Sequence, residues 1–237
     1  MTTAEKILRA KQDIDEVYEA GKSQGGLDFN EILSNGALGD YRYRFAGAFW
    51  NDGNFKPTCN IRAGYAEKMF AYSKITNLKQ ILEDCGVSLD ISEASKNNNV
   101  TQMFQGSSIT DVGVFDVSQG APTYLLNGAQ KLINVEKIIL KNNGSQAFTS
   151  AFDNCKALKE IRFEGVIGKT LNFRWSTDLS ADSLYDIVTH LSDSSTGQTI
   201  TFPTTAEANY NAAPPANAPQ TWAALLATKQ NWSIAYA

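Results

Sequence analysis

The feature that most constrains the fold of this chain is an internal repeat in its middle part. Residues 69–78 (MFAYSKITNL) match residues 103–112 (MFQGSSITDV) at an offset of 34. A second match, at an offset of 23, pairs Leu132, Val135, Ile138 and Leu140 with Cys155, Leu158, Ile161 and Phe163. In each unit a Phe or Ala comes first, a Ser or Cys follows three residues later, and an apolar strand-like piece ends the unit. Such a unit cannot bury its apolar side alone, so the units are expected to stack as a solenoid, with insertions such as residues 92–99.

The N-terminal residues predict a helix over about 4–20. Thr2 and Glu5 match a capping box, and its apolar stripe consists of Ile7, Ala10, Ile14 and Val17. A helix this short is marginal by itself, so it packs either on its own domain or on copies of itself. β-branched residues at both seam positions favour more than two strands, so a homo-oligomer larger than a dimer is expected if the helix packs on its own copies.

Residues 27–61 form an aromatic-rich connecting segment whose Gly- and Asn-rich stretches indicate turns. A small packed cap and a carbohydrate-stacking site both fit this composition. Four aromatic residues have no clear place in a repeat core and are the candidate ligand-binding residues: Trp50, Tyr65, Tyr72 and Trp175. Together with the Asn clusters at 97–99 and 142–143 they suit sugar or protein recognition. For each of them, simple packing is the alternative.

Residues 176–237 are predicted to cap the repeats with a different α/β unit. Ser180 is a good N-cap for a helix over 181–191, and residues 199–202 form a strand. Thr204 and Glu207 match a second capping box that opens a short helix. A last short helix begins at Trp222, and residues 232–236 form a closing strand.

The chain carries little equipment for acid–base or metal chemistry. It has one histidine, His190, which is expected near the end of the cap helix in a structural role. Cys155 occupies the core slot of a repeat as a small hydrophobe, and no basic partner is near Cys59 or Cys85. Three cysteines leave at least one free thiol, so a disulfide scaffold is not expected. We therefore expect no enzymatic activity, no cofactor and no bound metal.

Charge and hydropathy exclude two further classes of partner. The net charge is −4, and only 19% of the residues are charged. A duplex-DNA binder needs clustered Lys and Arg, so no nucleic-acid partner is expected. No apolar stretch approaches the roughly 18 residues of a membrane-spanning helix, and no signal peptide is visible.

Residues 152–165 (FDNCKALKEIRFEG) resemble the BspA-type leucine-rich repeat, a unit with the pattern F-x-x-C-x-x-L-x-x-I. The resemblance covers about residues 65–175 and implies an α/β leucine-rich-repeat solenoid. The early units depart from the pattern, because they carry Ser73 and Ser107 where Cys is usual. The flanks, with FEGVIG at 163–168, NWSIAY at 231–236 and the N-terminal segment at 11–22, resemble repeat proteins among phage and prophage structural genes of Firmicutes.

These observations divide the chain into an N-terminal helix (1–26), the aromatic segment (27–61), the solenoid (62–175) and the cap (176–237). The resemblance implies a non-enzymatic, tail-associated structural or host-recognition protein whose ligand is a host-surface glycan or protein. It would reside in the virion, or in the host cytoplasm before assembly. The alternatives are a bacterial cell-surface adhesin-like binding module and, less favoured, a glycan-cleaving tail protein.

Overall fold

The computed structural model describes residues 61–62, 66, 68–86, 88–91 and 100–237. Over these residues the chain is a mixed α/β protein with three small sheets, all of them parallel. The first sheet pairs β1 (Ile61–Arg62) with β2 (Leu89–Asp90). The predicted N-terminal helix and its seam residues Ile7, Ala10, Ile14 and Val17 lie outside the described residues, as do Trp50, Cys59 and Tyr65.

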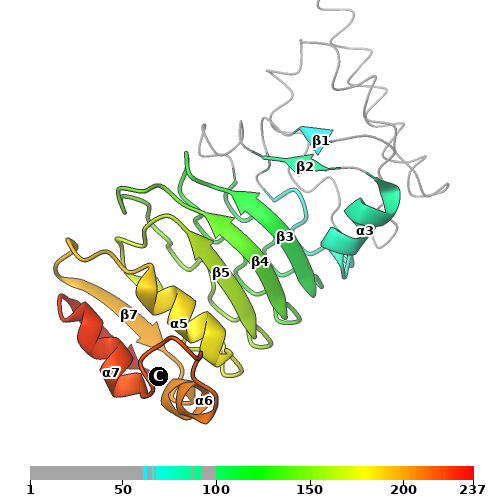
Figure 1. Cartoon of the computed structure of the whole chain (residues 1–237). Helices are drawn as coiled ribbons and strands as arrows, with labels where there is room; N and C mark the ends of the chain where they lie inside the picture. The colour runs from blue at the N-terminus through cyan, green and yellow to red at the C-terminus, as the bar shows by residue number, and fades with distance from the viewer. Residues whose placement is uncertain (1–60, 63–65, 67, 87, 92–99) are drawn as a thin grey trace, which may run out of the picture.

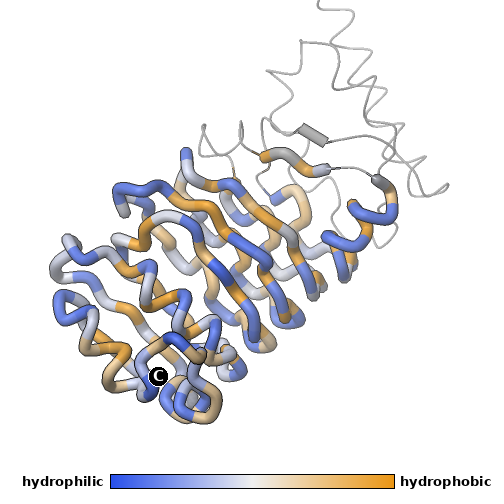
Figure 2. The backbone as a smooth tube through the Cα atoms, in the orientation of Figure 1, coloured by the Kyte–Doolittle hydropathy of each residue, from blue (hydrophilic) through white to orange (hydrophobic). Residues whose placement is uncertain are grey.

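The central sheet consists of β3 (Asp111–Asp116), β4 (Asn134–Ile139) and β5 (Glu160–Glu164), side by side in chain order (Figure 1). Apolar and polar residues are interspersed along these strands (Figure 2). The buried positions alternate in β5 but lie three residues apart in β3 and β4, and together they form one buried face. The inward side chains, all buried, are Val112, Phe115, Val135, Ile138, Ile161 and Phe163. The prediction that Val112, Ile138 and Ile161 share one sheet is confirmed.

The predicted strand at Leu78 is wrong, because Leu78 begins a helix, α3 (Leu78–Cys85). The side chain of Asn77 accepts a hydrogen bond from the backbone N–H of Gln80 and so caps α3. The offset of 34 itself holds up to this point, since Asn77 forms a parallel bridge with Asp111. The repeat therefore continues to Asn77, and α3 then takes the place where a strand was expected.

The predicted offset of 23 between the third and fourth units is also wrong. Val135 pairs with Ile161, an offset of 26, and a register shift then pairs Ile138 with Phe163. The offset of 23 instead relates β3 to β4, where Val112 pairs with Val135. The error has a simple cause. Apolar residues recur at every third position from Leu132 to Ile138, so the third unit can be aligned with the fourth equally well at two offsets that differ by three residues.

On the side of the molecule away from the central sheet, successive turns are joined by backbone hydrogen bonds. The N–H groups of Phe70, Phe104 and Leu126 donate to the carbonyls of Met103, Leu125 and Ala151, at 2.8, 2.9 and 3.0 Å. Phe152 follows in the same position and stacks on Phe173, with ring centroids 4.8 Å apart. Three residues after these positions, in the slot predicted for Ser or Cys, stand Ser73, Ser107, Ala129, Cys155 and Ser176, all buried. Ala129, and not Leu132, therefore fills the slot in the third unit.

The C-terminal region begins with β6 (Leu171–Asn172), which forms a parallel sheet with β7 (Gln198–Phe202) and β8 (Trp232–Tyr236). Helix α5 (Ala181–Thr189) follows β5 in space (Figure 1), and α6 (Ala206–Ala212), α7 (Trp222–Leu226) and a 3₁₀ turn (Ala227–Lys229) complete the region. The predicted strands at 199–202 and 232–236 and the helix that begins at Trp222 are confirmed.

Two predicted helix caps have different outcomes. Ser180 caps α5 as predicted, since its hydroxyl accepts from the N–H of Ser183 at 3.1 Å. The second capping box is wrong: Thr205 precedes α6, and no side-chain hydrogen bond caps that helix. The Thr205 hydroxyl donates instead to the carbonyl of Thr177 at 2.6 Å. The hydroxyl of Thr205 is therefore engaged in a tertiary hydrogen bond and does not cap α6.

Candidate functional site: the turn strip

The joined turns place one residue of each turn in a row on the surface, and we call this row the turn strip. Its members stand two positions after the Phe70-type residue and are Tyr72, Gly106, Gly128, Asn154 and Trp175. The N–H groups of Tyr72, Gly106 and Gly128 donate to carbonyls of the following turn at 2.8, 2.8 and 2.7 Å. Neighbouring backbones in such a ladder are about 4.8 Å apart, so the two aromatic ends of the strip lie about 19 Å from each other.

Trp175 belongs to the strip because side chains join its turn to the preceding one. Phe173 stacks on Phe152, and the hydroxyl of Ser176 donates to the carbonyl of Cys155 at 3.1 Å. The amide of Asn172 donates to a carboxylate oxygen of Asp153 at 3.1 Å. The Phe152–Phe173 and Cys155–Ser176 contacts share an offset of 21, which puts Trp175 next to the position of Asn154, while the Asn172–Asp153 bond crosses between the two turns diagonally.

Tyr72 lies at one end of the strip with its ring across Gly106. A Cβ at Gly106 would come within 2.6 Å of the Tyr72 ring, so only glycine leaves room for it. Gly106 also has a positive φ of 62°, which glycine adopts without strain. One side of the ring thus rests on the backbone, while 44% of the Tyr72 residue surface is exposed. The geometry presents a fixed aromatic surface to the solvent.

Trp175 lies at the other end and is 39% exposed. Two cations accompany its indole: the guanidinium carbon of Arg174 is 5.0 Å from the ring centroid, and the ammonium of Lys156 is 5.8 Å from it. Both distances are within the range of cation–π attraction. Two cations therefore accompany the ring at the Trp175 end; at the Tyr72 end the exposed Lys74 stands at the position that corresponds to Lys156.

The middle of the strip is polar and open. Beyond Gly106, which the Tyr72 ring covers, Gly128 carries no side chain, and the neighbouring side chains carry amides. The Nδ2 of Asn127 donates to the carbonyl of Ser150 at 3.3 Å, and Gln105 accepts from Gln102 at 2.7 Å. Amides of this kind both donate and accept, which suits hydroxyl-rich ligands.

Of the four aromatic residues predicted to bind ligand, the structure describes two, and both lie on the turn strip. Tyr72 and Trp175 are on the same face but at opposite ends of it. The sequence prediction missed Lys156, Arg174 and Asn154. The signal was present, because the F-x-x-C unit at Phe152 places Asn154 and Lys156 on either side of Cys155; only the alignment to the next turn was lacking.

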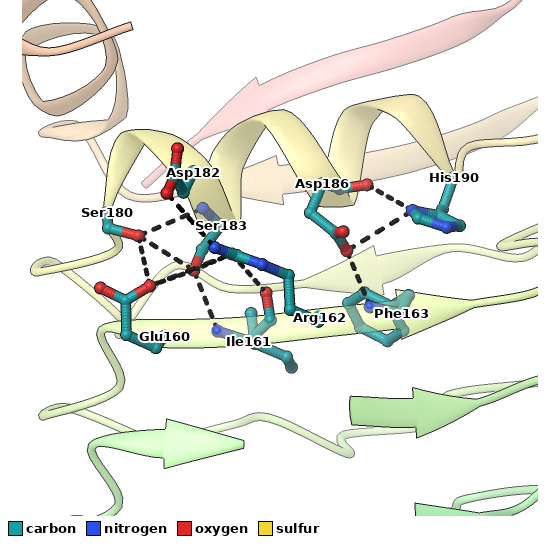
Figure 3. Close-up of polar contacts among 9 residues, drawn as sticks. All are labelled: Glu160, Ile161, Arg162, Phe163, Ser180, Asp182, Ser183, Asp186 and His190. Carbon is teal, nitrogen blue, oxygen red and sulfur yellow. Dashed lines mark hydrogen bonds and ion pairs between the residues drawn. The ribbon is translucent and has the colours of Figure 1, made fainter. Parts of the chain in front are cut away.

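The histidine and its neighbours form a different kind of cluster, which joins α5 to β5 (Figure 3). The Nδ1 of His190 is 2.8 Å from the carbonyl oxygen of Asp186, and the Asp186 carboxylate accepts from the N–H of Phe163 at 2.7 Å. The hydroxyl of Ser183 accepts from the N–H of Ile161 at 2.9 Å. Burial raises the pKa of Asp186 above its usual range. Ser183 and Asp186 contact backbone groups of β5, so the cluster joins α5 to that strand. His190 is the C-cap residue of α5, which confirms its predicted place near the end of the cap helix.

Cysteine and metal chemistry find no support among the described residues. Cys155 is buried, its thiol donates to the carbonyl of Leu126 at 3.1 Å, and burial raises the pKa of that thiol. Cys85 is exposed and not in a disulfide. In this part of the chain no group of three or more His, Cys, Asp or Glu side chains is placed to hold a metal ion. The same residues include no helix that is both long and apolar enough to cross a bilayer.

A shallow hollow of about 450 Å³ lies at the carboxyl ends of the central strands. It is lined by Ser118, Gln119, Ile139, Leu140, Lys141, Asn142, Asn143 and Glu164. The predicted Asn cluster at 142–143 thus borders this hollow. It does not belong to the turn strip.

Comparison with protein-family models, with curated proteins and with solved structures finds no match to this chain.

Proposed function

We propose that residues 62–175 form a BspA-type leucine-rich-repeat solenoid. Two features of the described residues support this. The central strands are parallel and follow one another in chain order, and the turns opposite them repeat a buried small residue at the position of Cys155. Neighbouring turns are also joined by hydrogen bonds on both sides, which is how stacked repeats share one core.

We further propose that the protein is a non-enzymatic, phage- or prophage-encoded structural or host-recognition protein that is associated with the tail. The observation that carries this proposal is the turn strip, in which exposed Tyr72 and Trp175 stand at the two ends of a stretch of glycines and amides. Exposed aromatic surfaces held by a rigid scaffold are typical of recognition surfaces. The resemblance of the flanking segments to phage structural proteins supplies the biological setting.

We also propose that the protein assembles as a homo-oligomer, preferably a trimer, joined through residues 4–20. Light scattering on the full chain and on a chain without residues 1–22 tests this. We expect the full chain to be trimeric and the shortened chain to be monomeric. A full chain that stays monomeric at high concentration would contradict the seam formed by Ile7, Ala10, Ile14 and Val17.

Binding of the fluorescently labelled full chain to a panel of Firmicutes cells tests the recognition role. The key variant combines Tyr72→Ala with Trp175→Ala, and Tyr124→Ala with Ile133→Ala is the matched control, since these two large side chains are also exposed but lie outside the strip. We expect the strip variant to lose at least tenfold in cell binding and the control to bind like the wild type. Equal binding by the strip variant and the wild type would refute the proposal.

A further inference from the structure

We propose that the Trp175 end of the turn strip binds the acidic group of an anionic saccharide. This inference rests on the proposed recognition function and names its ligand class. The group of residues that carries it consists of Trp175, Arg174 and Lys156, with the amide of Asn154 beside it.

The first step is the charge at this end of the strip. Among the described residues neither Arg174 nor Lys156 forms an ion pair, although Arg162, Lys137 and Lys229 each contact a carboxylate. The acidic residues of the same two turns, Asp153 and Asp178, are charged but accept hydrogen bonds from the amide of Asn172 and the hydroxyl of Thr177, and neither forms an ion pair with Arg174 or Lys156. Two cations without an ion-pair partner among the described residues thus flank one exposed indole.

The second step concerns the surface formed by the two cations and the Trp175 indole. A carboxylate or phosphate that approaches Arg174 finds a fork of N–H donors, and Lys156 adds a second charge. The indole beside them offers a flat apolar surface, which suits the C–H face of a sugar ring. An acidic sugar satisfies the cations and the indole at the same time.

The third step distinguishes a saccharide from a peptide. Peptides commonly bind by adding a strand to a free sheet edge or by filling apolar pockets. Along the strip the N–H groups of Tyr72, Gly106 and Gly128 already donate to the next turn, so this backbone is occupied. The strip instead offers amides and ring faces, to which hydroxyl groups and sugar rings are complementary.

The test uses two pairs of polymers that differ only in charge. Polygalacturonate is compared with its fully methyl-esterified form, and phosphomannan with the same mannan after removal of phosphate. Affinities of the full chain are measured by calorimetry at low and at high NaCl. The first pair reports a preference for carboxylate and the second a preference for phosphate.

We expect at least one acidic polymer to bind about tenfold more tightly than its neutral partner, with the difference shrinking as NaCl screens the charges. The variant Lys156→Gln with Arg174→Gln should reduce binding to the neutral level. Lys156→Arg with Arg174→Lys keeps both charges and should retain most of it. The matched control, Lys141→Gln with Lys169→Gln, removes one half-buried and one exposed charge from the loops after β4 and β5 and should bind like the wild type.

Three outcomes would overturn the inference: equal affinity for the charged and neutral forms, no binding of either acidic polymer, or full binding by the Lys156→Gln, Arg174→Gln variant. None of them decides the recognition role, which depends on the cell-binding result for the Tyr72→Ala, Trp175→Ala variant. The failure of the ligand class and the failure of the proposed function are thus measured separately.

Discussion

The two edges of the central sheet are both covered by a helix, but in different ways. At the β5 edge, Ser183 and Asp186 of α5 accept hydrogen bonds from the N–H groups of Ile161 and Phe163. The helix thereby supplies the acceptors that a further parallel strand would have supplied. An exposed strand edge can pair with a strand of another chain. Helix α5 covers the β5 edge and also accepts hydrogen bonds from its backbone N–H groups.

At the β3 edge, α3 covers the strand mainly by contact. The bridge between Asn77 and Asp111 comes just before the helix, and within the described residues no side chain of α3 hydrogen-bonds to the backbone of β3. The Lys79 stem lies near Gly113, and its ammonium pairs with Glu83 of the same helix at 2.5 Å. The α3 end is thus shielded while the α5 end is bonded, and this predicts unequal stability of the two ends.

The largest expected effect comes from breaking the α5 contacts. Ser183→Ala with Asp186→Ala leaves two backbone N–H groups of β5 without acceptors, and each such group costs about 1–3 kcal/mol. We expect the double variant to lose about 4 kcal/mol of unfolding free energy in urea titrations. A loss below about 1 kcal/mol would show that water replaces the helix as acceptor and that the two edges are equivalent.

The second comparison concerns buried serines at equivalent positions. Ser107, toward the α3 end, has a buried hydroxyl with no hydrogen-bond partner, whereas the hydroxyl of Ser176, toward the α5 end, donates to Cys155. Ser107→Ala should therefore stabilise the protein by about 1 kcal/mol, and Ser176→Ala should destabilise it by a similar amount. Thermal unfolding of both variants measures this, and destabilisation by Ser107→Ala would contradict the assignment of an unpartnered hydroxyl.

The pH dependence of stability reports on Asp186. Burial raises the pKa of this carboxyl in the folded state above its ordinary value of 3.8, so the folded chain binds the proton more tightly than the unfolded chain. The contribution of the Asp186 carboxyl to the free energy of unfolding is therefore highest at low pH, and it falls as the pH rises from the ordinary pKa to the raised pKa. Asp186→Asn keeps an acceptor for Phe163 and should remove this fall.

Urea midpoints of the wild type and Asp186→Asn between pH 3 and 7 provide the measurement. Relative to the wild type, the variant should gain stability as the pH rises. If its relative stability is instead greatest at the acidic end, then the contacts to Phe163 and His190 outweigh burial, and the stated direction is wrong.

The smallest expected effect is at the α3 end. Lys79→Ala removes exposed ion pairs with Glu83 and, at 3.9 Å, with Glu136 of β4, and such pairs contribute little because solvent screens them. The variant should show the same urea midpoint as the wild type within experimental error. A clear loss would mean that the lysine stem seals the β3 edge and that the α3 end resembles the α5 end after all.

Local signals made the C-terminal elements predictable. Ser180, the turn before β7 and the aromatic strand at 232–236 each specify their element within a few residues, without reference to the rest of the fold. The register of the repeats was not predictable in this way, because Leu132, Val135 and Ile138 match a neighbour at two offsets. Only the hydrogen bonds of the folded chain select the offset of 26.

The helix at Leu78 and the grouping of the candidate site residues also depend on contacts between turns, which the sequence does not specify. The Asn77 cap is a local signal for α3, but the match between 69–78 and 103–112 favoured a strand. Tyr72 and Trp175 stood out as aromatic residues without a core position. Arg174 and Lys156 did not stand out, since what brings them to one indole is the packing of successive turns.

The unequal steps between turns have a consequence for how such a chain can be altered. Successive strands are 23 and then 26 residues apart, yet the backbone ladder on the opposite side continues through Leu126 and Ala151. Part of the longer step is the loop with Asn142 and Asn143, which borders the hollow at the carboxyl ends of the strands. Loops on that side can therefore lengthen, shorten or be exchanged between variants while the turn strip keeps its spacing. The fold separates a surface that is free to diversify from a surface whose geometry the core holds constant.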